Sequence, residues 1–176
     1  MNSKQSRYNK FYMDMADRVA QMSHAVRRKV GSVMVKEGNI ISFGWNGMPA
    51  GWDNNCEDKD FMSGDAGGWL DFEEIQEHWP FEETSDLDGE YIGRYRLKTK
   101  PEVLHSEANA ILKIARSSES SEGSTLFTTL APCHDCAKLI YQSGISSVYY
   151  RDTYRDSRGV EFLEKCGVKV ERLGGE

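Results

Sequence analysis

The sequence lacks the long apolar runs of a membrane protein. No window approaches the roughly 18 consecutive apolar residues of a membrane-spanning helix. The polar stretch from Met1 to Lys10 has no apolar core followed by a small-residue cleavage site, so no secretory signal is predicted. A mean hydropathy of −0.62 with 28% charged residues is ordinary for a globular chain. We expect a cytoplasmic protein with no membrane partner.

Cysteine is scarce as well. The four cysteines are too few and too unevenly spaced for a disulfide framework. Only Cys133 and Cys136 form a close pair, and in a reducing compartment such a pair indicates metal binding or catalysis first. We expect Cys166, on an apolar helix face, to pack in the core, and Cys56 to be structural or exposed rather than functional.

The chain also lacks an excess of positive charge. Its formal charge is −6 and its pI is near 5.3, which argues against a protein that neutralises many phosphates along a nucleic acid polymer. Residues 51–100 hold 14 acidic and 5 basic residues, a net of −9, so the rest of the chain carries +3. The acidity is therefore confined to one segment.

Apolar periodicity predicts helices and strands along most of the chain. Tyr8 to Met22 should form an amphipathic helix, with apolar residues at helical spacing at Phe11, Met15, Val19 and Met22. Val30–Val35 and Ile40–Trp45 read as a hairpin. The later elements are a helix from His105 to about Arg116, a strand at 125–129, a helix from Pro132 to Gly144, a strand at 147–151, a helix at 160–166 and a strand at 168–170.

Helices separate the later strands, which is typical of parallel strands joined by crossovers. We therefore predict an α/β fold of three layers, α/β/α, with a five-stranded mixed sheet. Residues 1–176 should form one domain carrying an acidic insertion at about 52–104. Residues 52–100 show no sustained period and are expected to be partly ordered by Trp69, Phe72, Trp79 and Phe81.

Two motifs carry the chemistry, His105-Ser106-Glu107 and Pro132-Cys133-His134-Asp135-Cys136, and each stands at the start of a predicted helix. Cys133 and Cys136 are three residues apart, so a helix brings both to one face, and its N-terminal dipole favours thiolates. With His105 they supply three zinc ligands. Three protein ligands leave a fourth position for water, as in catalytic rather than structural zinc sites.

Glu107 is two residues from His105 and points away from the same metal face on a regular helix. It is better suited to carry protons, because deamination needs a proton at the ring nitrogen and at the departing ammonia. His-x-Glu with Pro-Cys-x-x-Cys and a glutamate that is not a ligand is the arrangement of zinc nucleobase deaminases.

Other interpretations of these residues remain open at this stage. The cysteine pair alone could be a redox pair or half of a zinc ribbon, although no second pair exists. His134, His24 and His78 are expected to be structural or exposed rather than ligands. A different class would be a zinc-stabilised binding module in which Glu107 only caps the helix dipole.

Over almost its whole length the sequence resembles the deoxycytidylate deaminase family in its bacteriophage-like form, within the cytidine deaminase fold. The resemblance includes the stretches 105–111 and 129–133, Ser23-x-x-x-Arg27-x-x-Val30-Gly31, and residues 44–51. It implies zinc-dependent conversion of dCMP to dUMP, a dTMP precursor, in the host-cell cytoplasm if the chain is phage-encoded. By this resemblance Ser23 and Arg27 bind the substrate phosphate, Asn46 the deoxyribose, Ala108 and Tyr154 the nucleotide, and Glu107 is the acid/base.

The resemblance further implies a homohexamer activated by dCTP and inhibited by dTTP, with Mg²⁺ accompanying the effector near Asn46, Gly47 and Gly51. Some relatives carry a second, structural zinc with a cysteine where this chain has Ala25, and Cys56 alone cannot rebuild that site. The residues do not decide whether dCTP is also a substrate.

A tRNA adenosine deaminase or a polynucleotide cytidine deaminase shares the same two motifs. A polymer substrate calls for a broad basic face, which an acidic segment of net −9 would oppose.

Overall fold

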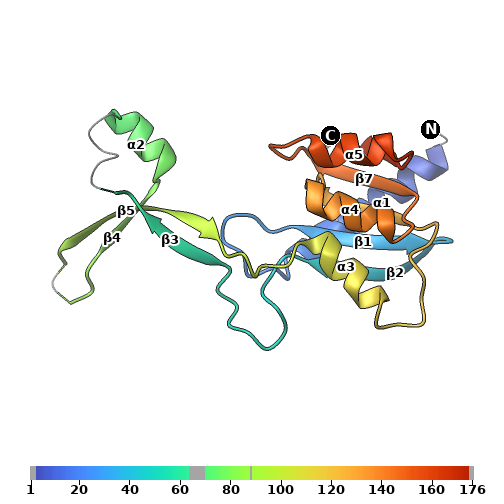
Figure 1. Ribbon diagram of the computed structural model, residues 1–176, viewed down its shortest axis with the longest axis horizontal. Coiled ribbons are helices and arrows are strands. Elements are labelled where there is room, and N and C mark those ends of the chain that lie inside the picture. The colour runs from blue at the N-terminus through green and yellow to red at the C-terminus, as the bar shows by residue number, and fades with distance from the viewer. Residues whose placement is uncertain (1–2, 64–69, 88, 175–176) are drawn as a thin grey trace.

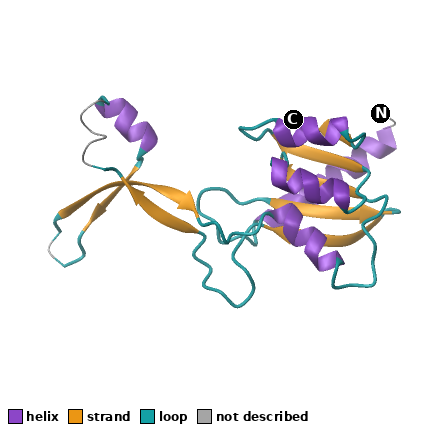
Figure 2. Cartoon of the chain, in the orientation of Figure 1, coloured by secondary structure: helices purple, strands orange, loops and turns teal. Residues whose placement is uncertain are grey.

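The computed structural model describes residues 3–63, 70–87 and 89–174 of the chain (Figures 1 and 2). Its elements are α1 (Ser3–Ala20), β1 (Gly31–Lys36), β2 (Asn39–Trp45), β3 (Glu57–Phe61), α2 (Phe72–His78), β4 (Phe81–Thr84), β5 (Tyr91–Thr99), α3 (Ser106–Ile114), β6 (Thr125–Leu130), α4 (His134–Gln142), β7 (Ser147–Asp152), α5 (Arg158–Lys165) and β8 (Lys169–Arg172). No helix in these ranges is long and apolar enough to cross a membrane.

The larger sheet has five strands in the order β2-β1-β6-β7-β8. β1 pairs antiparallel with both β2 and β6, whereas β6, β7 and β8 run parallel to one another. Each parallel connection passes through a helix, α4 or α5, because parallel neighbours need a crossover. The predicted five-stranded mixed sheet with parallel later strands is confirmed.

Helices cover both faces of this sheet (Figure 1). On one face Tyr12 and Ala16 of α1 pack with Phe127 of β6. On the other face α3, α4 and α5 bury one apolar cluster against the strands, in which Ile140 and Leu163 are fully buried. These are the three layers that the sequence predicted.

The buried face of α1 differs in part from the predicted one. Phe11 and Met22 are 51% and 58% exposed, while Ala16 and Ala20 face the sheet. The reason is the close approach of α1 to β1. A Cβ at Gly31 would lie 2.2 Å from the carbonyl oxygen of Ala16, so only small residues fit at this crossing. Phe11 and Met22 therefore lie toward solvent, whereas Met15 and Val19 are half-buried against the apolar cluster on this face of the sheet, as predicted.

The second sheet, β3-β5-β4, projects away from the main body together with α2 (Figure 1). We call residues 57–99 the arm. Although its sequence shows no sustained period, the segment forms three strands and a helix. α2 begins at a capping box in which Asp71 and Glu74 bond each other's backbone N–H groups, a signal visible in the sequence as Asp-x-x-Glu.

Aromatic side chains order the arm, as expected for three of the four that the sequence singled out. The rings of Phe81 and Tyr95 stack at 5.4 Å, Arg96 lies 5.6 Å from the centre of the Trp79 ring, and Arg94 lies 6.0 Å from that of Phe72. Trp69 lies outside the described residues. The strands of the arm are short and charged, and their apolar and polar residues alternate too weakly to be recognised from sequence. Their pairing partners also lie up to 42 residues away, as for Glu57 and Thr99.

Candidate active site

The two motifs meet because α3 and α4 begin at neighbouring points over the same face of the sheet. His105 is the N-cap residue of α3 and Cys133 that of α4. Gly44 of β2 lets α3 lie close to the sheet, since a Cβ there would fall 2.3 Å from the carbonyl oxygen of Ser106. Two helix N-termini, each with its positive dipole end, thus face one site.

The ligand atoms of His105, Cys133 and Cys136 lie within 4.8 Å of one another. Nδ1 of His105 is 3.4 Å from the Sγ atom of each cysteine. Two ligands of tetrahedral zinc, one nitrogen and one sulfur, are separated by about 3.5 Å at normal bond lengths. The donor set and its spacing therefore fit zinc, with a fourth position left over.

Protons in this cluster are shared unequally. Hydrogen bonds from Cys136 and His105 lower the pKa of Cys133 to about 4. The neighbouring Cys133 sulfur and burial raise the pKa of Cys136, and the bond to Cys133 raises the pKa of His105. Metal ligands bind in the thiolate and neutral imidazole forms, so metal binding at these three residues would release protons.

Glu107 lies beside the cluster without joining it. Its side chain is 4% exposed, and burial raises its pKa, against the opposing effects of its own backbone N–H and His105. Ser106 donates a 2.9 Å hydrogen bond to Oε2 of Glu107, and Ser32 lies 2.7 Å from the Ser106 hydroxyl. A carboxyl group with a raised pKa beside a metal site is suited to exchange protons.

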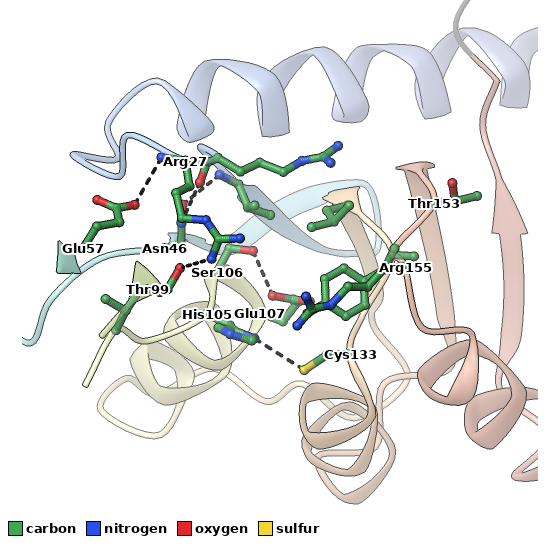
Figure 3. Close-up of a pocket in the computed structure, with 16 residues that line it drawn as sticks. Arg27, Asn46, Glu57, Thr99, His105, Ser106, Glu107, Cys133, Thr153 and Arg155 are labelled. Atoms are coloured by element: carbon green, nitrogen blue, oxygen red, sulfur yellow. Dashed lines mark hydrogen bonds between the residues drawn. The ribbon is translucent and has the colours of Figure 1, made fainter. Parts of the chain in front are cut away.

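These groups line one cavity of about 330 Å³ (Figure 3). Of the site residues predicted from sequence, those that line it are Arg27, Asn46, His105, Glu107, Cys133 and Tyr154. The structure therefore brings the catalytic motif together with Arg27, predicted at the phosphate, and Asn46, predicted at the sugar. Their parts in substrate binding stay predictions.

Ser23 is not among the lining residues. It is 2% exposed, donates to the carbonyl of Asn46 at 2.7 Å and accepts the N–H of Ala25. The side chain of Asn46 in turn accepts the N–H of Val30 and donates to the carbonyl of Arg28. Ser23 and Asn46 thus hold the irregular segment between α1 and β1 in place.

The other predicted residues lie near the cavity but not on its wall. Ala108 follows Glu107 on α3 and is half-buried. Gly47 is bonded through its backbone to Leu104, just before the metal-binding histidine. Gly51 is exposed with φ of +88°, in the turn that leads away from β2. An effector role for Asn46, Gly47 and Gly51 stays a prediction.

Sequence reasoning missed several residues of the cavity wall, among them Arg28, Arg155, Glu57 and Thr99. Arg28 lines it and pairs with Asp152 at 2.8 Å, and Arg155 lines it from the loop after β7, over the Tyr154 ring. Glu57 and Thr99 reach the cavity from the arm. The run Arg27-Arg28-Lys29 was a visible signal for a cationic wall, but nothing local marks Thr99 or Glu57.

Ala25 and Cys56 pack together in a small apolar cluster with Val103 and Met48. Among the described residues the only group of three or more potential ligands is the His105 cluster. His134 packs edge-on against Phe162, and Cys166 packs against the main core as expected. His24 and His78 are exposed, also as expected.

An α/β/α fold that carries a His, Cys, Cys metal site at two helix N-termini, with a buried glutamate beside it, defines the zinc-dependent nucleobase deaminases. The family model described as "Cytidine and deoxycytidylate deaminase zinc-binding region" matches residues 6–152. The chain therefore belongs to the cytidine and deoxycytidylate deaminase family, which confirms the resemblance and makes the protein a deaminase.

Three relatives illustrate this kinship. The deoxycytidylate deaminase of Enterobacteria phage T4 is 38% identical over 170 residues, 90% of this chain and 86% of the relative. That of Homo sapiens is 33% identical over 149 residues, 84% and 66% of the two chains. Among solved structures, the crystal structure of dCMP deaminase from cyanophage S-TIM5 in complex with dCMP and dUMP aligns with a TM-score of 0.70. The alignment covers 98% of this chain and 99% of the cyanophage chain, with 36% sequence identity.

Proposed function

We propose that this protein hydrolyses dCMP to dUMP and ammonia. The observation that carries the proposal is the shared cavity, in which His105, Cys133 and Glu107 are accompanied by three arginines, Arg27, Arg28 and Arg155. A nucleobase deaminase needs the first set, and a phosphate-bearing substrate calls for the second. The dCMP and dUMP bound by the similar cyanophage enzyme support the same substrate and product.

The arginines differ in their availability to a phosphate. Arg28 is already paired with Asp152. Arg27 donates one guanidinium N–H to Thr99, a neutral partner, and Arg155 lies over the Tyr154 ring. Among the described residues, neither arginine forms an ion pair with a carboxylate. We therefore assign phosphate binding to Arg27 and Arg155. Arg28 is less available to the phosphate because it is ion-paired with Asp152.

The reaction adds water at C4 of the cytosine ring and expels the 4-amino group as ammonia. His105, Cys133 and Cys136 would hold zinc, which when bound would supply a water of lowered pKa, about 7 in such sites. Glu107 takes the proton that the attacking water loses and delivers it to the ring nitrogen. It then takes the remaining proton of the hydroxyl now at C4 and delivers it to the amine, so that the C–N bond breaks, ammonia leaves and the C4 carbonyl forms. Ser106 holds the Glu107 carboxylate in place for both transfers.

We infer a cytoplasmic homohexamer, activated by dCTP and inhibited by dTTP, with Mg²⁺ accompanying the effector. This part of the proposal rests on the resemblance at residues 46–51. The backbone hydrogen bonds between Gly47 and Leu104 support the effector site. Leu104 directly precedes His105, so a ligand on the loop would lie close to the proposed metal site. A nucleic acid polymer is a poor substrate by comparison, since residues 51–100 carry a net charge of −9.

Ammonia release decides the proposal. The zinc-loaded protein is given dCMP, dCTP, deoxycytidine and a cytosine-containing oligonucleotide in parallel. We expect the highest kcat/KM with dCMP and none measurable with the oligonucleotide. Turnover of the oligonucleotide in preference to dCMP would assign the protein to the polynucleotide deaminases, and no turnover of any substrate with zinc bound would favour a binding module.

A further inference from the structure

The arm contributes to the active site through the first pair of residues at its base. We propose that Glu57 and Thr99, which face each other across β3 and β5, are positioning residues that hold Arg27 toward the substrate phosphate. The inference rests on the proposed function, in which Arg27 binds that phosphate. It gives the arm a role in substrate recognition that its sequence does not indicate.

Arg27 needs external support because no regular structure orients it. It lies between α1 and β1, in a stretch where residues 21–30 form neither helix nor strand, and it is exposed. A free arginine side chain loses up to about 2 kcal/mol of rotamer entropy when it is fixed. Partners that fix it before the substrate arrives reduce this cost of binding.

Glu57 holds the backbone at Arg27. The glutamate is 6% exposed, and its carboxylate accepts the N–H of Val26 at 3.1 and 3.2 Å and the N–H of Arg27 at 3.2 Å. A buried carboxylate is costly unless hydrogen bonds satisfy it, and these bonds to consecutive N–H groups do so. The carboxylate therefore fixes where the segment turns toward the cavity.

Thr99 holds the other end of the same residue. Its Oγ1 accepts a hydrogen bond of 3.0 Å from Nη1 of Arg27. The acceptor is a neutral hydroxyl, so the guanidinium keeps its charge uncompensated and available for an anion. In Figure 3 the guanidinium of Arg27 lies beside Thr99 on the wall opposite Cys133.

Both contacts depend on one register. Glu57 and Thr99 are paired across β3 and β5. This one cross-strand pair therefore binds Arg27 twice, with Glu57 at its backbone N–H and Thr99 at its guanidinium. A slip of one residue between β3 and β5 would place the Glu57 and Thr99 side chains on opposite faces of the sheet. The remainder of the arm secures that register, with pairing continued out to Phe61 and Tyr95.

The test uses Thr99→Val, which keeps the β-branched shape and removes only the hydroxyl. In the zinc-loaded enzyme we expect KM for dCMP to rise about tenfold, the effect of one lost hydrogen bond to a charged group, with kcat nearly unchanged. KM for deoxycytidine, which has no phosphate, should stay within about twofold of wild type. Thr99→Ser should restore dCMP binding, and Thr84→Val, at an exposed threonine of β4, should behave as wild type.

Glu57→Gln probes the second contact, since it removes the charge and leaves one acceptor oxygen. It should raise KM for dCMP more than KM for deoxycytidine. Asp58→Asn, at the next position of β3 and 65% exposed, is the matched control and should change neither.

Equal losses on dCMP and deoxycytidine, or no change on either, would overturn the positioning role. If the wild-type protein turns over no dCMP, the proposed function has failed. Calorimetric titration of dCMP into wild type and Thr99→Val then still decides this inference, because unchanged affinity between the two would refute it and a tenfold loss would support it.

Discussion

The hydroxyl of Ser106 donates a 2.9 Å hydrogen bond to Oε2 of Glu107, its neighbour in the first turn of α3. Both side chains are buried, at 0% and 4% exposure. The bond fixes the carboxylate beside the metal ligands while leaving Oε1 without a bond to Ser106. Glu107 lies outside the group of His105, Cys133 and Cys136 that could hold a metal ion, in keeping with the proton-carrying role that we propose for it.

Replacing Glu107 by Gln should separate catalysis from metal binding. The amide keeps the shape of the side chain but cannot carry a proton, and general acid/base groups contribute about 10²–10⁴-fold. We expect kcat to fall at least a hundredfold on that scale while zinc stays bound at wild-type stoichiometry. Steady-state kinetics and metal analysis of the purified variant measure both. Retention of more than about a tenth of wild-type kcat would refute the acid/base role of Glu107. The control is Glu102→Gln, at an exposed position before α3, which should keep wild-type kcat.

Removing a metal ligand should abolish metal and activity together. Cys133→Ala leaves two ligands, His105 and Cys136, and two ligands cannot hold zinc in a tetrahedral site. We expect zinc content and turnover to be lost in parallel. A chelator should inactivate the wild-type protein, and added zinc should restore it. Cys166→Ala, in the core away from the site, should keep its metal; full activity in metal-depleted Cys133→Ala would contradict the assignment.

Arg27→Ala should act on the phosphate alone. Truncating one partner of a charge-assisted contact costs about 2–5 kcal/mol, so kcat/KM for dCMP should fall at least about thirtyfold. Deoxycytidine offers the guanidinium no anion, and its kcat/KM should change little. Lys29→Ala removes a nearby exposed cation that does not line the cavity and serves as the control. A similar loss on both substrates would show that Arg27 is structural.

Asp152 should stabilise the fold in a pH-dependent way. Hydrogen bonds from Arg151, and then the charge of Arg28, lower the pKa of this carboxyl below its usual value. A depressed folded pKa stabilises the protein above the unfolded pKa of about 3.9, and this contribution is lost as the pH falls through the folded value. Because the side chain is 38% exposed, the contribution is at most about 1 kcal/mol.

Asp152→Asn should therefore lower the free energy of unfolding at pH 7 and pH 5 and approach the wild-type value below about pH 4. Urea titrations at a series of pH values measure the difference. A gap that stays constant down to pH 3 would mean that the ion pairs of Asp152 are not its source.

Nucleotide effectors should change the shape of the velocity curve. If the loop from Asn46 to Gly51 binds an effector, subunits that share two states must couple it to the substrate. Velocity should rise sigmoidally with dCMP, become hyperbolic with dCTP and Mg²⁺, and shift to higher substrate with dTTP. Initial-rate measurements test this. A hyperbolic curve that neither nucleotide alters would remove the regulatory proposal and leave the catalytic one intact.

The sequence by itself determined the elements and groups that depend on short-range spacing. Cys133 and Cys136 come together because Cys133 is the N-cap residue of α4 and Cys136 lies three residues further on, and Glu107 lies two residues after His105, the N-cap residue of α3. The mixed sheet with parallel later strands likewise followed from helices that alternate with apolar strands. These features need only local geometry.

Only the tertiary structure decided the features that join distant segments. Glu57 and Thr99 meet Arg27 from 30 and 72 residues away, and no local pattern marks either of them. Ser23 bonds to Asn46 instead of lining the cavity, and Ala16 is buried in place of Phe11 because α1 must approach Gly31. Strand register and the closeness of packed backbones set these contacts, and both are properties of the assembled chain.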